Sequence, residues 1–312
     1  MSKAIFKSAS KKPVVFFHMP DADGWCSGAI VQRFLGEVEL IPVNYGLDFP
    51  WGKVKGREVH MVDFGLQPFS DMVRLEKEAE SLTWVDHHQT AIDAHDEHVK
   101  ENPEFKIEGL RRVGDAACEL CWEYYAGPTS EELPEAVYLL GRYDVFDLDA
   151  DPDVVPFQYG VRLHDLRPTG AEALALWKEF FEGRSLESEI ENGKVILQYL
   201  ERGNESLVKS AAFETEHGGI KFLAINGLHK GSMQFDSMWD ENKYDATMIF
   251  GYRDGSWTAS FYTVKEGVDV SVIAKEYGGG GHKGAAGCQW AWGELPDWVV
   301  QPGLAWAGEP VE

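Results

Sequence analysis

Residues 14–35 read VVFFHMPDADGWCSGAIVQRFL, and this stretch decides the fold. Residues 14–17 are β-branched or aromatic, which predicts a buried strand. Residues 25–35 place apolar side chains at helical spacing, which predicts a helix soon after the strand. The polar segment HMPDADG, residues 18–24, joins the two. A strand, a polar turn and a helix in this order are typical of the α/β class.

The same alternation continues through the first half of the chain. The predicted strands are residues 39–43, 59–62 and 82–85, and the predicted helices are residues 68–79, 114–126 and 133–143. Strands that alternate with helices favour a mostly parallel sheet with helices on both faces.

The second half predicts a smaller α/β domain behind a helical connector. Residues 185–212 combine helical periodicity with many charges. The elements predicted beyond it are strands at 220–226, 246–252 and 256–263 and a helix at 269–277 that runs into the cluster GGGGHKGAAG (278–287). The tail from residue 289, rich in Trp, Gly and Pro, has no predicted element. We expect a first domain over residues 1–190, a connector over 191–212 and a second domain over 213–312.

Composition indicates a globular protein with two cores. The chain has 312 residues, of which 44% are hydrophobic. No apolar run approaches the roughly 20 residues that span a bilayer, and the N-terminus lacks the apolar segment of a signal peptide. We therefore expect a soluble, cytoplasmic protein with no membrane partner. The pair Cys118 and Cys121 is expected to pack in a core rather than to bind zinc, which needs a second pair.

The net charge is −23 at pH 7. Proteins that bind long nucleic acids usually carry a basic stripe, which releases counterions from the phosphate backbone, and this sequence shows none. The charge therefore favours a small phosphorylated substrate, and no long nucleic acid is expected as a partner. The sequence leaves the oligomeric state open, a homodimer included.

Acidic and histidine side chains follow three of the predicted strands. They are His18, Asp21 and Asp23 after residues 14–17, Asp63 after residues 59–62, and Asp86, His87 and His88 after residues 82–85. In open α/β sheets, ligands bind outside the carboxyl ends of the strands, so we expect these side chains to meet in one crevice. Taken singly, each aspartate is more often a helix cap or a turn residue. Their joint occurrence at three strand ends favours a functional cluster.

Oxygen and imidazole ligands together suit manganese. A pair of ions about 3.5–4 Å apart can generate hydroxide at neutral pH and hold both oxygens of an in-line displacement at phosphorus. The cluster therefore predicts phosphoryl chemistry with two Mn²⁺ ions as cofactors; Co²⁺ and Mg²⁺ are the alternatives.

Five motifs resemble those of the DHH/DHHA1 family of phosphoesterases. They are HMPDADG at 18–24, VDF at 62–64, DHH at 86–88, GRYD at 141–144, and GGGHKGAAG at 279–287, which is similar to the signature of the DHHA1 domain. Their order and their spread over most of the chain identify it as a member of this family, similar to nanoRNases and oligoribonucleases and related to RecJ.

The resemblance implies a role for each matching residue. The implied ligands are His18, Asp21 and Asp63 for a first manganese, and Asp23, the bridging Asp63, His87 and Asp144 for a second. Asp86 would lie behind the ions and orient His87 or its neighbours. His88 would face the substrate phosphate as hydrogen-bond donor or general acid, with a water between the ions as nucleophile. His18 precedes Asp21 by three residues, where many relatives have four.

The glycine cluster has a physical interpretation of its own. Consecutive glycines let the backbone approach a ligand closely and offer N–H groups to phosphate oxygens, and the histidine within the cluster adds a donor. The residues assigned to substrate binding are Gly279, Gly280, Gly281, His282 and, from the fourth motif, Arg142.

Other polar residues are predicted to lie outside the site. Asp147, Asp149, Asp151 and Asp153 alternate like a calcium loop but lack its glycine and glutamate, so a solvated loop is expected. His95 and His98 lie in a polar stretch and are expected on the surface. Asp115 is left open between a helix cap and a site residue.

The expected function is hydrolysis of phosphate esters of short oligonucleotides, dinucleotides or nucleotides by a two-metal mechanism. The alternatives are a RecJ-like single-strand exonuclease, a pyrophosphatase or polyphosphatase, and a catalytically silent nucleotide-binding module.

Overall fold

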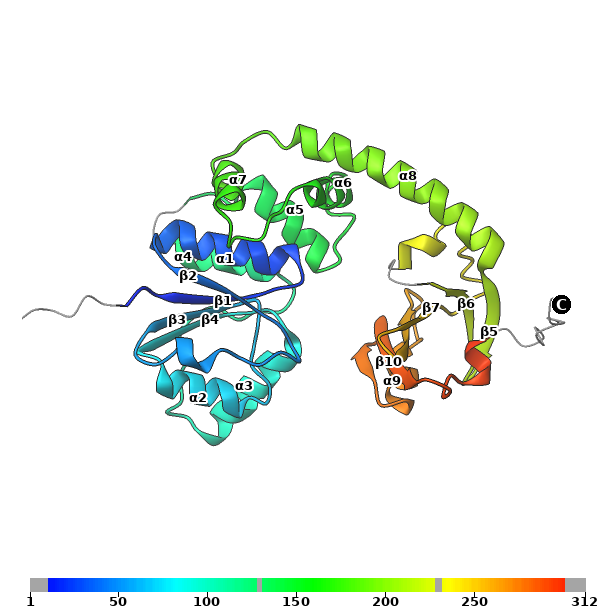
Figure 1. The fold of residues 1–312 in the computed structure, drawn as a ribbon, viewed down its shortest axis with the longest axis horizontal. Coiled ribbons are helices and arrows are strands. Elements are labelled where there is room, and N and C mark those ends of the chain that lie inside the picture. Colours follow the sequence, from blue (N-terminus) through cyan, green and yellow to red (C-terminus); the bar gives the residue numbers. More distant parts are fainter. Residues whose placement is uncertain (1–10, 128–130, 228–231, 301–312) are drawn as a thin grey trace, which may run out of the picture. The chain divides into compact units, whose positions relative to one another are not determined.

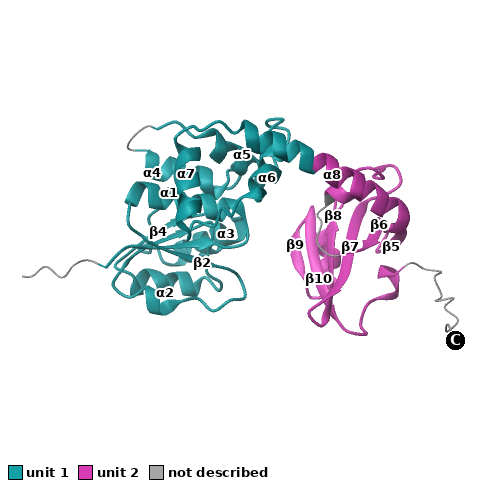
Figure 2. Cartoon of the chain, turned by 45° about the horizontal axis from the view of Figure 1, so that its top comes forward, with its two compact units in different colours: residues 1–196 teal, residues 197–312 magenta. Residues whose placement is uncertain are grey.

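The structure is a computed structural model that describes residues 11–127, 131–227 and 232–300. The chain divides into two compact units, Met1–Ile196 and Leu197–Glu312, and helix α8 (Glu187–Ala211) crosses the boundary (Figure 2). The predicted domain limits at 190 and 212 stay a prediction. Among the described residues, no helix combines the length and the apolarity that crossing a bilayer requires.

The sheet of the first unit has four strands in the order β2-β1-β3-β4, all parallel. The strands are β1 (Val14–His18), β2 (Glu39–Val43), β3 (Glu58–Val62) and β4 (Ser81–Val85). The predicted parallel sheet is confirmed, and each predicted strand lies within one residue of an observed one.

Helices cover both faces of this sheet (Figure 1). The helices of the first unit before α8 are α1 (Ala22–Leu35), α2 (Ser70–Glu78), α3 (Gln89–Glu101), α4 (Ala117–Ala126), α5 (Glu135–Asp144), α6 (Val154–Gly160) and α7 (Ala171–Phe181). Figure 1 shows α2 and α3 on one side of the sheet and α1, α4, α5 and α7 on the other. Short 3₁₀ helices lie at Trp51–Lys53 and Val161–Leu163.

Alternate residues of β1 enter two separate cores. Val15 and Phe17 join the core with α1 and α4, whereas Val14 and Phe16 join the core with α2. Because side chains of a strand alternate between faces, a strand buried on both reads as a continuous apolar run. This explains why VVFF marks the centre of the sheet.

His95 and His98 are more buried than the polar stretch around them suggests. Both belong to α3, which sequence patterning missed, and both are half-buried. The His98 ring lies 4.7 Å from the Phe105 ring, and the His95 ring lies 5.7 Å from that of Trp84. Aromatic side chains from outside the polar stretch provide this burial, so the local sequence could not reveal it.

The second unit has a six-stranded sheet in the order β5-β6-β7-β8-β10-β9. Its elements are β5 (Phe213–His217), β6 (Ile220–Asn226), β7 (Ala246–Arg253), β8 (Ser256–Tyr262), α9 (Val270–Glu276), β9 (Gly280–His282) and β10 (Ala285–Ala291), with 3₁₀ helices at Ser232–Phe235 and Asp297–Val299. The β6–β7 pair is parallel and the other pairs are antiparallel. The predicted smaller α/β domain is confirmed.

The glycine cluster forms a hairpin rather than an open loop. β9 is an exposed edge strand that pairs with β10, with Gly281 opposite Ala286 and His282 opposite Ala285. Beyond β10, Val299 of the Trp-rich tail is buried in the core of the unit. Residues 301–312 of that tail lie outside the described residues.

All four cysteines are unpaired and buried. Cys118 and Cys121 lie on α4 in the core of the first unit, where the Cys118 thiol donates to the Val137 carbonyl at 3.7 Å. Core packing, rather than zinc binding, therefore accounts for the pair.

Candidate metal centre

The carboxyl ends of three neighbouring strands carry the predicted residues. β1 ends at His18, and Asp63 and Asp86 directly follow β3 and β4. Because β1, β3 and β4 are parallel neighbours, these side chains lie along one edge of the sheet.

The turn between β1 and α1 brings His18 next to Asp21. Asp21 is the N-cap of α1, and its Oδ1 accepts a hydrogen bond from the Gly24 N–H at 3.0 Å. A Cβ at Gly24 would lie 2.2 Å from the His18 carbonyl oxygen, so only glycine fits there. His18 Nδ1 consequently lies 3.0 Å from Asp21 Oδ2 despite the spacing of three residues.

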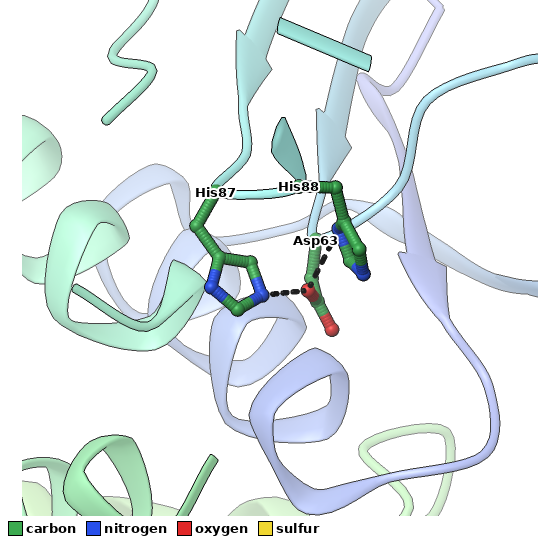
Figure 3. Close-up of side chains that lie close together, drawn as sticks. All are labelled: Asp63, His87 and His88. Carbon is green, nitrogen blue, oxygen red and sulfur yellow. Dashed lines mark ion pairs between the residues drawn. The ribbon is translucent and has the colours of Figure 1, made fainter. Parts of the chain in front are cut away.

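Asp63 lies at the centre of the cluster and has a left-handed backbone, with φ of 56°. Aspartate tolerates this conformation better than most residues do. Its buried carboxylate points one oxygen to each side: Oδ2 lies 3.5 Å from His18 Nδ1, and Oδ1 lies 3.4 Å from His87 Nε2. Figure 3 shows His87 and His88 both directed at this carboxylate.

Three overlapping groups of side chains place potential ligand atoms within 4.8 Å of one another. The groups are His18, Asp21 and Asp63; Asp23, His87 and Asp144; and Asp63, His87 and His88. In the second group, His87 Nε2 lies 3.4 Å from Asp144 Oδ2 and 3.7 Å from Asp23 Oδ2. The first group is the ligand set that the resemblance implies for one ion, and the second is the set implied for the other ion without the bridging Asp63. Their role as metal ligands stays a prediction.

Asp23 links the cluster to the start of α4. Its carboxylate accepts hydrogen bonds from the backbone N–H groups of Ala117 at 2.9 Å and Cys118 at 2.6 Å. These first amides of a helix have no partner within the helix, and they carry the positive end of its dipole. Helix capping and metal ligation therefore need not be alternatives for this residue.

Asp86 is fully buried behind the cluster. Its side chain bonds to the ring of His88 and not to the ring of His87. Its Oδ1 is 2.7 Å from His88 Nδ1 and also accepts from the backbone N–H groups of His87 and His88. The indole N–H of Trp84 donates to Oδ2 at 3.2 Å. Since Nδ1 of His88 is bound in this way, Nε2 is the nitrogen left for a substrate.

Charge crowding raises the pKa values of two aspartates. Burial, together with the negative charge of Asp63, raises the pKa of Asp23 to about 7, although His87 opposes the shift. Burial, together with the charge of Asp23, likewise raises the pKa of Asp144 to about 7. The nearby His87 lowers both pKa values but does not outweigh burial and the neighbouring carboxylates.

The histidines respond in the opposite direction. Burial alone would lower their pKa values, but the hydrogen bond to Asp63 and the charges of the aspartates raise the pKa of His87 to about 10. Contacts with Asp21 and Asp63 raise the pKa of His18, against burial, to about 10. The cluster as a whole attracts cations.

The donor set fits divalent metal ions. His18 Nδ1 is buried and faces two carboxylates, yet it makes no hydrogen bond of good geometry. Imidazole nitrogens and carboxylate oxygens around such an atom are ligands suited to Mn²⁺, Zn²⁺ or a similar ion. The site therefore offers side chains that can hold metal.

Arg142 has a set of contacts that the sequence did not reveal. Its guanidinium forms ion pairs with Glu119 and, at 3.4 Å, with Asp147. Glu119 in turn accepts from the Ala116 N–H at the start of α4. These contacts tie Arg142 to the frame of the site, and its part in substrate binding stays a prediction.

The remaining predicted residues fall outside the cluster. Gly279, Gly280, Gly281 and His282 belong to the second unit, and their contact with substrate stays a prediction. Asp115 accepts a hydrogen bond from Arg112 at 2.6 Å and is neither the N-cap of α4 nor a member of the three groups. None of the three groups includes Asp147, Asp149, Asp151 or Asp153.

Sequence reasoning missed Tyr45, whose ring lies 5.8 Å from that of His18. Tyr45 follows the predicted strand 39–43 by two residues. The strand-end rule that found the other residues applies to it equally, but a search for ionisable metal ligands passes over an aromatic side chain.

Comparison with known proteins identifies a DHHA1 domain at residues 221–299. The uncharacterized protein R106 of Acanthamoeba polyphaga mimivirus is 22% identical over 301 residues, which cover 88% of this chain and 66% of that relative. The chain thus spans just under two thirds of the length of this curated relative.

Two solved structures share the fold. A pGpG-specific phosphodiesterase of Vibrio cholerae, PggH, aligns with 90% of this chain and 94% of its own at a TM-score of 0.54 and 14% identity. An exopolyphosphatase-related protein of Bacteroides fragilis aligns over 91% of this chain and 88% of its own chain, at a TM-score of 0.53 and 11% identity. The second unit thus contains a DHHA1 domain, and the motifs of the first unit, together with the shared fold, support the resemblance of the chain to the DHH/DHHA1 family.

Proposed function

We propose that this protein is a DHH/DHHA1 phosphoesterase that hydrolyses phosphate esters of short oligonucleotides, dinucleotides or nucleotides with two divalent ions, preferably Mn²⁺. One observation carries the proposal: Asp63 directs one carboxylate oxygen towards His18 and the other towards His87. A carboxylate placed in this way can serve two ions at once.

His18, Asp21 and Asp63 would hold one ion, and Asp23, His87 and Asp144 the other, with Asp63 shared. When bound, such a pair neutralises phosphate charge and lowers the pKa of the attacking water. The protein provides the ligand geometry and the buried surroundings in which these charges act strongly.

His88 is proposed as the group that meets the leaving oxygen. Burial lowers its pKa, but the hydrogen bond to Asp86 and the charges of Asp86 and Asp63 outweigh burial and raise it above 6.5. Nδ1 donates to Asp86, and in the protonated ring Nε2 carries a second proton that can pass to the leaving oxygen. Asp86 keeps the ring in the tautomer and orientation that this transfer needs.

A small substrate is favoured by charge. The net charge of −23 repels a long polyanion wherever metal ions do not neutralise the surface. The relative PggH, which shares the fold, is named for a dinucleotide substrate. The exposed strand β9 of the second unit supplies glycine backbone and His282, which are suited to hydrogen bonds with a nucleotide.

Hydrolysis by purified protein tests the proposal. The substrates are a dinucleotide, 3′-phosphoadenosine 5′-phosphate, a cyclic dinucleotide, a long single strand and pyrophosphate, each with Mn²⁺, Co²⁺ or Mg²⁺. The proposal expects a metal-dependent activity on the small nucleotides that Asp63→Asn abolishes. Asp93→Asn is the matched control, because Asp93 is an exposed aspartate on α3.

Four results would contradict the proposal. Full activity of Asp63→Asn would place the reaction elsewhere. Preference for the long single strand would favour the RecJ-like exonuclease, and preference for pyrophosphate would favour the pyrophosphatase. Nucleotide binding without turnover under any metal would favour the silent module.

A further inference from the structure

We propose that Tyr45 is the platform on which the nucleobase of the substrate stacks, beside the metal centre. The inference rests on the proposed function and names the part of the substrate that the first unit recognises in addition to phosphate.

The turn after β2 places Tyr45 next to His18 of the metal centre. β2 pairs in parallel with β1, with Val43 opposite His18, so both strands end at the same edge of the sheet. The next four residues form a turn in which the Leu47 N–H donates to the Asn44 carbonyl at 3.3 Å. Gly46 has φ of 79°, the left-handed conformation that the third position of a type II turn requires.

The Tyr45 ring is supported on one side and open on another. It lies 4.5 Å from the Phe64 ring at an interplanar angle of 38°, and it meets His18 edge-on at 5.8 Å and 69°. Phe64 is 3% exposed, whereas Tyr45 is 39% exposed. The ring is therefore a surface with a buried backing, immediately next to a predicted metal ligand.

This arrangement suits a nucleobase. Bases stack on exposed aromatic rings without regard to sequence, because every base has a π-face. A ring already fixed by Phe64 and by the Asn44 turn loses little conformational freedom when a ligand covers it. With a phosphate near His18 and Asp63, the base of the same nucleotide lies one sugar away, which is the range of Tyr45.

The platform would distinguish nucleotides from inorganic phosphates. Pyrophosphate and polyphosphate have no ring to stack and gain nothing from Tyr45. A nucleotide gains the burial of apolar ring surface on both partners. Tyr45 is thus a specificity residue and not a metal ligand.

Calorimetry on the Mn²⁺-loaded full-length protein tests the inference without a catalytic readout. The probes are guanosine 5′-monophosphate and ribose 5-phosphate, which differ in the base. We expect the wild-type protein to bind the nucleotide more tightly. Tyr45→Leu should lose about tenfold in affinity for the nucleotide and none for ribose 5-phosphate, since one base–aromatic stack is worth roughly this factor. Tyr45→Phe, which keeps the ring, should retain both affinities.

Equal affinity of the wild-type protein for the two probes would overturn the inference, and so would an equal loss of both in Tyr45→Leu. If Tyr45→Leu does not fold, Tyr45→Trp decides the matter: stacking expects nucleotide binding at least as tight as in wild type, and a tenfold loss contradicts it. The proposed function is judged separately by hydrolysis. A wild-type enzyme that cleaves dinucleotides while Tyr45→Leu keeps the same KM would leave the function standing and remove the platform.

Discussion

Asp86 Oδ1 lies 2.7 Å from His88 Nδ1, and the aspartate is fully buried while the histidine side chain is 33% exposed. The buried residue therefore orients the one that can meet a substrate. Asp86→Asn keeps the shape but removes the charge that holds the pKa of His88 above its ordinary value.

We expect Asp86→Asn to reduce kcat by about 10- to 100-fold, the usual effect of losing a partner that orients an active residue. His88 must be protonated to act as an acid, so activity falls as pH rises through its pKa. In the variant this fall should occur at lower pH. A pH–rate profile with Mn²⁺ measures it; an alkaline limb that does not move would argue against His88 as the acid.

Stability of the metal-free protein should fall as pH rises through neutrality. Asp23 and Asp144 have pKa values raised to about 7 from 3.8, so the folded state binds more protons than the unfolded state between these values. Their favourable contribution is present at low pH and is lost as pH rises through 7. His18 and His87, raised to about 10 from 6.5, act in the same direction up to that pH.

Manganese should reverse this dependence because its binding displaces those protons. Thermal unfolding from pH 5 to 9, with chelator or with Mn²⁺, measures both curves. We expect the increase in Tm caused by Mn²⁺ to be larger at pH 8 than at pH 6. Asp144→Asn should raise the Tm of the metal-free protein at pH 8 and shrink the metal effect; a pH-independent metal effect would be inconsistent with ligands that titrate here.

Gly24→Ala should damage both stability and the metal centre. The added Cβ would lie 2.2 Å from the His18 carbonyl oxygen, so β1 and α1 must separate. We expect a loss of about 1–3 kcal/mol, typical of overpacking, and weaker Mn²⁺ binding through the shifted His18 and Asp21. Gly203→Ala in α8 is the control, because its Cβ would meet nothing within 4 Å. Equal Tm values for the two variants would refute the tight-turn argument.

The sheet of the first unit and the cluster at its edge could be predicted from the sequence because their signals are local. Each strand is a short apolar run, and each is followed at once by its polar residue, so strand ends at His18, Asp63 and Asp86 identify one edge. The parallel order of the strands then brings residues far apart in sequence together without any knowledge of side-chain packing.

Features that depend on partners distant in the chain could not be predicted. Asp23 accepts hydrogen bonds from the backbone amides of Ala117 and Cys118, which lie 94 and 95 positions further along the chain at the start of α4. His98 is partly buried by the rings of Phe105 and Phe69. The polar residues around His98 in the sequence give no sign of these contacts. A run of glycines alone suggests a loop, but in the structure this run forms strand β9 because it pairs with β10.

Anomalous diffraction from crystals soaked in Mn²⁺ tests the central claim most directly. We predict two manganese peaks, one on each side of the Asp63 carboxylate. The first should lie next to His18 and Asp21, and the second next to Asp23, His87 and Asp144. Both peaks should be weaker in Asp63→Asn. Crystals whose manganese lies elsewhere, or in which Asp63 touches no ion, would contradict the claim.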